Sequence, residues 1–104
     1  MSGSNRRRRG GGASVSPCST LTFDATVNSP QATALATLAV GDVLELTLMT
    51  GGQGVAVMKN AAIVGTLTGI RVAQMINCMN SGFDYKAIVS SLNGGQCVVR
   101  VEPL

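Results

Sequence analysis

Short runs of alternating apolar and polar residues, separated by glycine-rich turns, constrain the fold of this chain most strongly. In residues 20–27, Leu21, Phe23, Ala25 and Val27 alternate with polar side chains, which is the period of a half-buried strand. Residues 43–49 alternate in the same way, and the glycine-rich residues 50–54 join them to a further apolar run at 55–58. Glycine accepts the positive φ angles of tight hairpins, so these segments predict antiparallel strands.

Three more strands are predicted further along the chain. Residues 59–61 form a turn before a strand at 62–67, and residues 83–89 and 96–101 form two strands around the turn at 93–95. Residues 32–40 are rich in alanine and fit either one helical turn or another strand, and we favour a short helix or loop.

The hydrophobic period changes between residues 70 and 79. Apolar side chains recur there at spacings of three and four, which predicts one helix; they are Ile70, Val72, Ala73, Ile76 and Met79. Thr68 is the predicted N-cap, and residues 80–82 supply a stop signal. Five to six short strands with one inserted helix predict a mainly β protein, a small, partly open barrel of the OB or SH3-like kind.

The positive charge is concentrated ahead of this folded part. The arginine run (Arg6, Arg7, Arg8 and Arg9) holds four of the eight basic residues, and residues 10–104 carry four basic against five acidic residues, a net charge of −1. Residues 1–19 are rich in glycine, serine and arginine, so we expect a disordered basic arm followed by a single domain at residues 20–104. Arginine binds phosphate through two parallel hydrogen bonds, which makes the arm a candidate for contact with a polyanion.

The cysteines do not form a metal-binding pattern. Cys18, Cys78 and Cys97 are widely spaced, and the chain has no histidine to complete a zinc site. An odd number of cysteines without a secretory leader predicts reduced thiols in a cytoplasmic protein. No run approaches the roughly 18 apolar residues that span a bilayer, so no membrane association is expected.

The order of elements resembles that of the HIRAN domain, a small barrel found alone in bacteria and attached to DNA-remodelling helicases in eukaryotes. The resemblance lies in residues 55–58, in the strand end Ile63-Val64-Gly65-Thr66-Leu67, in the helix at 70–79 and in the strand at 83–89. Residues 49–54 stand where the family has a polar loop and contain neither an aromatic nor an acidic residue. The positions that carry over are Gly65 and Leu67, which we interpret as packing and backbone positions. The resemblance implies a barrel that binds nucleic acid.

The sequence therefore predicts a non-catalytic accessory module that binds nucleic acid. Its candidate contacts are the arginine run with Lys59, in a predicted turn, and Arg71, at the start of the helix, which could lie near each other on one rim. Without histidine, a P-loop or a nucleophile motif, no enzyme activity, cofactor or small-molecule substrate is predicted. The alternative is a protein-interaction module that self-associates or joins a larger complex, since only 12% of the residues are charged.

Overall fold

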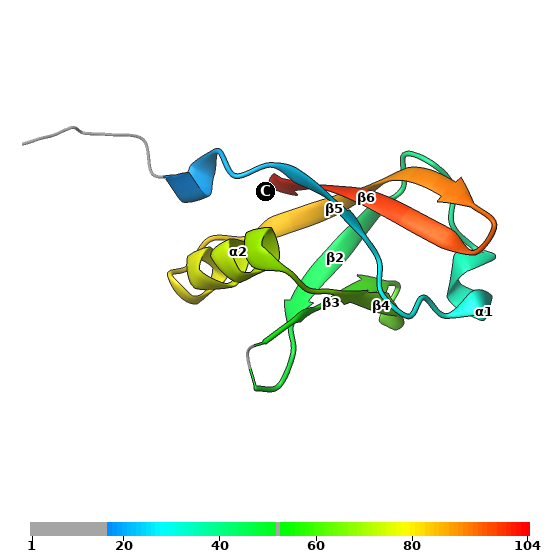
Figure 1. Ribbon diagram of the computed structural model, residues 1–104, viewed down its shortest axis with the longest axis horizontal. Coiled ribbons are helices and arrows are strands. Elements are labelled where there is room, and N and C mark those ends of the chain that lie inside the picture. The colour runs from blue at the N-terminus through cyan, green and yellow to red at the C-terminus, as the bar shows by residue number, and fades with distance from the viewer. Residues whose placement is uncertain (1–16, 52) are drawn as a thin grey trace, which may run out of the picture.

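Six antiparallel strands form one strongly curled sheet in the computed structural model, which describes residues 17–51 and 53–104 (Figure 1). The strands follow one another across the sheet in the order β1-β6-β5-β2-β3-β4. Their bounds are β1 Phe23–Thr26, β2 Val43–Leu48, β3 Val55–Lys59, β4 Ala62–Leu67, β5 Tyr85–Asn93 and β6 Gln96–Pro103. The predicted mainly β fold, a small and partly open barrel with one inserted helix, is confirmed.

Two helices accompany the sheet. Helix α1, Ala32–Leu35, is the short helix favoured by the sequence before Gly41. Helix α2, Ile70–Asn80, lies at one end of the curled sheet and buries Val72, Met75, Ile76 and Cys78. The apolar face predicted from residue spacing was partly wrong, because Ile70 is 83% exposed and Met75 takes the central buried position.

The hairpins follow from local turn chemistry. In the predicted hairpin between β2 and β3, Gly51 has a φ of 94°, and Gly52 lies outside the described residues. Between β3 and β4, Asn60 and Ala61 both have positive φ, at 51° and 68°, as the two central residues of a type I′ turn require. Hairpin β5–β6 turns at Gly94 and Gly95, also with positive φ.

The two edge strands approach each other and nearly close the barrel. The backbone of Asn28, just after β1, forms two hydrogen bonds with Thr66 on β4, with N to O distances of 2.7 and 3.1 Å. Gly65 lies at this seam, where a Cβ atom would be only 2.4 Å from Cγ1 of Val27. Its interpretation as a backbone and packing position is confirmed, as is that of Leu67, which is fully buried.

The core inside the barrel is aliphatic. Side chains of the described residues that alternate inward from the strands pack with the buried face of α2, and they include Leu44, Val55, Val57, Val64, Val99 and Val101. Tyr85 is only 3% exposed, and the partly buried Phe83 packs against the same core. The Tyr85 ring is therefore not accessible for stacking on a base.

Candidate nucleic-acid interface

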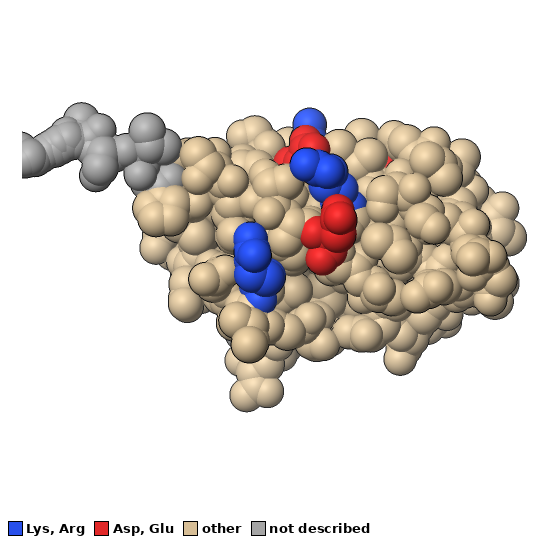
Figure 2. Space-filling view, turned by 45° about the horizontal axis from the view of Figure 1, so that its top comes forward, with Lys and Arg blue, Asp and Glu red and all other residues tan. Residues whose placement is uncertain are grey.

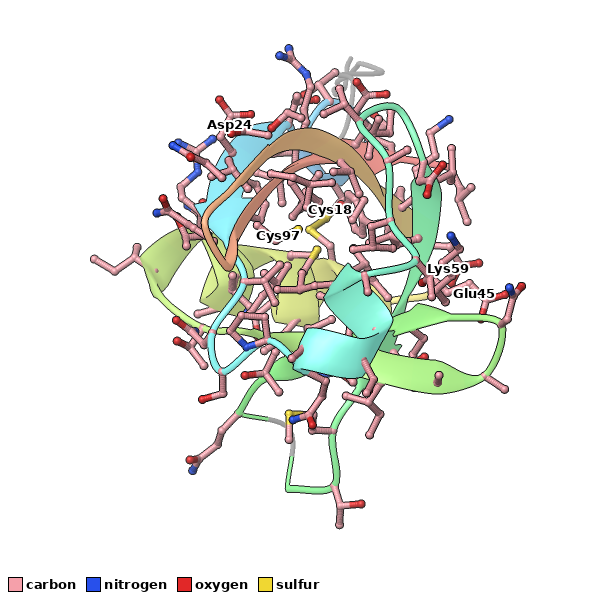
Figure 3. The ribbon with its side chains drawn as sticks, turned by 90° about the vertical axis from the view of Figure 1, so that its right-hand side faces the viewer. Cys18, Asp24, Glu45, Lys59 and Cys97 are labelled. Carbon is pink, nitrogen blue, oxygen red and sulfur yellow. A yellow bond between two sulfur atoms is a disulfide. The ribbon has the colours of Figure 1, made fainter. Side chains whose placement is uncertain are left out.

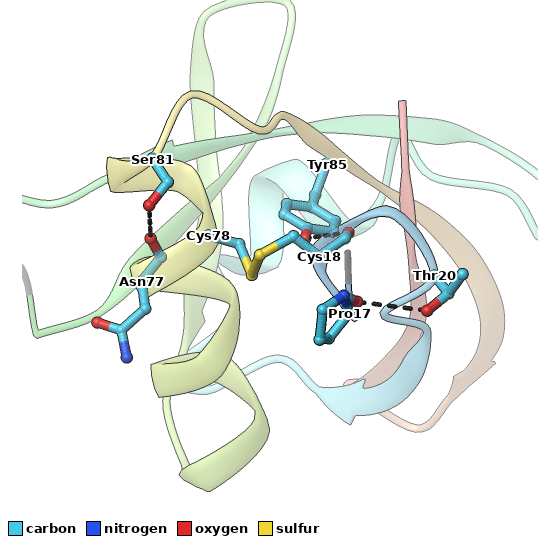
Figure 4. The surroundings of a disulfide bond; sticks show 7 residues. All are labelled: Pro17, Cys18, Thr20, Asn77, Cys78, Ser81 and Tyr85. Atoms are coloured by element: carbon cyan, nitrogen blue, oxygen red, sulfur yellow. Dashed lines mark hydrogen bonds between the residues drawn. A yellow bond between two sulfur atoms is a disulfide. The ribbon is translucent and has the colours of Figure 1, made fainter. Parts of the chain in front are cut away.

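The basic arm leaves the barrel from a covalently fixed base. Its arginine run lies outside the described residues, but a short 3₁₀ turn, Pro17–Ser19, begins the described chain. Cys18 in this turn forms a disulfide with Cys78 of α2, with 5.5 Å between their Cα atoms (Figure 4). The buried Tyr85 hydroxyl donates a hydrogen bond to the carbonyl oxygen of Cys18. These two contacts fix the point from which the arm leaves.

The disulfide corrects one prediction from the sequence, because Cys18 and Cys78 are not reduced thiols. Residues 17–19, which the sequence assigned to the arm, form a 3₁₀ turn. The pairing could not be predicted from the sequence, since 60 residues separate the cysteines and only the fold brings them together. Cys97 is the free cysteine among the described residues and is fully buried. Burial raises the pKa of the Cys97 thiol, which keeps it protonated and unreactive.

Arg71 lies at the N-terminus of α2, beside β1. Its guanidinium donates a hydrogen bond of 3.3 Å to the carbonyl oxygen of Thr22 and lies 5.7 Å from the centroid of the Phe23 ring. Both contacts hold the side chain against the barrel and leave it exposed. A positive charge here stands next to the positive end of the helix dipole, an arrangement that an anion would stabilise.

The start of α2 beside Arg71 presents groups of both signs. The first N–H groups of an α-helix have no partner inside the helix, and the first turn of α2 contains no acidic residue. The predicted cap was wrong: Gly69 is the N-cap, and the hydroxyl of Thr68 instead accepts a hydrogen bond of 2.9 Å from the amide of Asn28. A cavity of about 320 Å³ lies between this helix end and β1, and both Arg71 and the acidic Asp24 line it.

The side chain of Lys59 interacts with other groups of the barrel. Its ammonium group forms an ion pair of 3.1 Å with Asp42 and donates a hydrogen bond of 2.8 Å to the carbonyl oxygen of Thr37. The backbone N–H of Ala39 and the Lys59 ammonium together lower the pKa of Asp42 below its ordinary value. With its charge compensated, Lys59 is a weak candidate for phosphate contact.

The structure does not bring Lys59 and Arg71 together. Lys59 pairs with Ala62 at the beginning of β4, whereas Arg71 follows the other end of that strand. Six strand residues span about 17 Å, so one phosphate cannot touch both side chains. Figure 3 shows Lys59 on the opposite side of the barrel from Asp24, the β1 residue next to the Arg71 contacts.

The other charges of the barrel are interleaved. Figure 2 shows basic and acidic side chains alternating across one face, with uncharged surface on both sides. Asp24 pairs in register with Arg100, and Lys86 pairs in register with both Glu102 and Glu45. Because bases and acids alternate, this face carries no continuous basic patch. Over the described residues, no helix is long and apolar enough to cross a membrane, and no three His, Cys, Asp or Glu side chains form a potential metal site.

Comparison with known proteins identifies the fold alone. No protein-family model matches the chain, and no curated protein matches it. A crystal structure of a Lactobacillus plantarum protein from a structural genomics consortium superposes with a TM-score of 0.68 at 18% sequence identity. The match covers 79% of this chain and 92% of the other. The described barrel therefore has a counterpart among solved structures.

Proposed function

We propose that this chain is a non-catalytic, HIRAN-like nucleic-acid-binding module whose affinity comes mainly from its basic arm. The observation that carries the proposal is the separation of charge. Four arginines stand together in the arm, while the domain behind them has four basic and five acidic residues. An arm of this composition attracts phosphates without reading base sequence.

The anchored base of the arm supports the proposal. Because Cys18 is bonded to Cys78, the arginine run begins nine residues from a point fixed on the barrel. A short tether holds the arginines at a high effective concentration near any phosphate that touches the domain. The arm and the domain then act on the same nucleic acid rather than independently.

Arg71 is the second contact in this proposal. It is exposed, forms no ion pair among the described residues and stands at a helix end that favours an anion. In this proposal Lys59 does not contribute to the affinity for nucleic acid, because its ion pair with Asp42 would have to break before it could bind a phosphate.

Binding to labelled single-stranded DNA, duplex DNA and single-stranded RNA, measured by fluorescence anisotropy, tests the proposal. Replacing all four arginines of the arm by glutamine should weaken binding at least about tenfold at low salt, because four phosphate contacts are lost. Arg71→Gln should weaken binding less, and Lys59→Gln should leave it unchanged. Tight binding that survives the arm substitutions would refute the proposal.

A protein-interaction module is the second candidate, and exposed apolar side chains favour it. Among the described residues, Val40, Val43, Ile63 and Ile70 are between 53% and 83% exposed. Side chains of this size are stabilised when a partner covers them. If this candidate is correct, the full chain should retain a specific protein partner after the arm has been neutralised, as judged by co-purification and the mass of the complex.

The expectation of a cytoplasmic location stays a prediction. It was based on the lack of a recognisable secretory leader and on reduced cysteines, and the Cys18–Cys78 disulfide removes the second argument, since disulfides persist mainly in oxidising compartments. Fractionation of cells that express the full chain, with the cysteines trapped by alkylation, would show where the oxidised form resides.

A further inference from the structure

A groove opens in the sheet where β2 and β5 diverge. The two strands are paired from Val43 with Ile88 to Glu45 with Lys86, and their register ends there. Over the described part of the chain, residues 46–48 of β2 pair with β3 and not with β5. A cavity of about 480 Å³ lies at this divergence, and we call it the β2–β5 groove. A strand that has lost its neighbour can pair with an extended peptide, so the groove suits such a segment.

The β2–β5 groove has apolar side chains in its lining and acidic ones beside them. Val43 and Leu104 line it and are 62% and 79% exposed, and the half-buried Leu46 lies with them. Glu45 and Asp84 line it as well, and both are exposed. An extended segment with basic side chains could therefore cover apolar surface and contact carboxylates at the same time.

Acids outnumber bases in this groove. Lys86 is the basic residue of its lining, and it stands opposite Glu45 in the β2–β5 register. Across residues 17–51 and 53–104, none of Glu45, Asp84 and Lys86 takes part in an ion pair. The side chains of the groove thus supply two carboxylates against one ammonium group. This excess of one negative charge favours a basic occupant.

The base of the arm stands beside the groove. Tyr85 lines the groove, and its hydroxyl donates the hydrogen bond to the carbonyl oxygen of Cys18. In Figure 1 the Pro17–Ser19 turn lies near the C-terminal end of the chain, whose last residue also lines the groove. Arg9 stands eight residues before this turn, and eight residues extend to at most about 27 Å. The arm is therefore long enough to reach the groove of its own barrel.

We propose that the β2–β5 groove binds the chain's own basic arm, with the arginine run on Glu45 and Asp84. Residues 10–104 carry a net charge of −1, so the arm is the part of the chain with an excess of positive charge. Single exposed ion pairs are weak, but the short tether holds the arginines at a high effective concentration near the groove.

Docking of the arm does not depend on nucleic-acid binding, so either proposal can fail without the other. Where the proposed function holds, the groove and the phosphates compete for the same arginines. The docked arm then restrains its own barrel from binding nucleic acid weakly and at random.

NMR spectra of the full chain, recorded without nucleic acid, test the docking. Backbone amide shifts in the groove should differ between the wild type and the variant in which all four arginines of the arm are glutamine. The differences should be largest at Leu46, Thr47 and Lys86. They should disappear near 1 M salt, where the Debye length is about 3 Å. They should not change with protein concentration, because the arm acts within one chain.

Substitutions in the groove identify the carboxylates that hold the arm. Asp84→Asn should reduce the shift differences caused by the arm, and Glu45→Gln/Asp84→Asn should abolish them, because both variants keep the shape of the side chains and remove charge. Asp24→Asn is the matched control for Asp84→Asn, since Asp24 is also exposed but lines the cavity at the start of α2. This control should leave the differences as large as in the wild type.

Thermal unfolding of each variant separates lost docking from lost folding. Identical groove shifts in the wild type and the arginine variant would overturn the proposal, as would differences that persist in Glu45→Gln/Asp84→Asn. Differences that grow with protein concentration would also overturn it, because the arm would then occupy the groove of a second copy.

Discussion

Gly65 shows how a single residue determines whether the barrel can close. A Cβ atom at this position would lie 2.4 Å from Cγ1 of Val27 and 2.7 Å from the carbonyl oxygen of Asn28. The second of these is backbone, which cannot move aside without breaking the hydrogen bonds between Asn28 and Thr66. Glycine is needed here for close approach, since its φ is not positive.

Gly65→Ala should therefore destabilise the protein by about 1–3 kcal/mol in denaturant unfolding, as overpacking of a core does. Gly54→Ala is the matched control, because its Cβ would meet the flexible Met49 side chain at 3.3 Å. The control substitution should lower the free energy of unfolding by less than about 1 kcal/mol. Equal losses of stability in the two variants would show that the seam at Gly65 is not tightly packed.

Asp42 makes the stability of the barrel depend on pH. The N–H of Ala39 and the ammonium of Lys59 lower the pKa of its carboxyl in the folded state below the ordinary value of 3.8. A lowered folded pKa gives a stabilisation that is complete above pH 3.8 and is lost as the pH falls through the folded value. Asp42→Asn removes this titration, so its melting temperature should fall less than that of the wild type on acidification below pH 3.8. If the melting temperatures of the two proteins fall equally with pH, Asp42 does not cause the pH dependence of stability.

At the scale of elements, the Cys18–Cys78 disulfide joins the start of the folded chain to α2 across 60 residues. Cys18 of the Pro17–Ser19 turn packs half-buried against the core, and the disulfide and the Tyr85 hydrogen bond strengthen this attachment. A cross-link that closes a loop of this length strongly reduces the conformational entropy of the unfolded chain.

Removing the disulfide, by reduction or in the Cys18→Ser/Cys78→Ser variant, should lower the free energy of unfolding by about 2–4 kcal/mol. Denaturant unfolding with and without reductant measures the effect. Reductant should have no further effect on the double variant, since Cys97 is unpaired. A wild type whose stability is insensitive to reductant would show that the disulfide does not support the fold.

The elements themselves were largely predictable from the sequence, because alternation and glycine turns are local signals. The strands follow from them, and α2 follows from apolar spacings of three and four, whereas residues 32–40 fitted a helical turn, a strand or a loop. Features that depend on contacts between distant segments were not predictable, among them the disulfide and the separation of Lys59 from Arg71. Spacing alone also misplaced Ile70 in the core, since its side chain at the start of α2 is exposed.

At the scale of the whole molecule, the charges fall into two regions with different roles. The arm carries an uncompensated run of four arginines, and the barrel carries charges of both signs that largely cancel. Arg71 is the exception on the barrel, because its helix end favours an anion. We therefore expect the arm to supply most of the affinity for a polyanion and the barrel to position the arm.

The salt dependence of nucleic-acid binding tests this account most directly. For the full chain, the logarithm of the association constant should fall against the logarithm of salt concentration with a slope of about −3 to −4, as release of counterions from roughly four phosphates requires. With all four arginines of the arm replaced by glutamine, the remaining slope should be about −1 or shallower. An unchanged slope in that variant would contradict the account, since the phosphate contacts would then lie on the barrel.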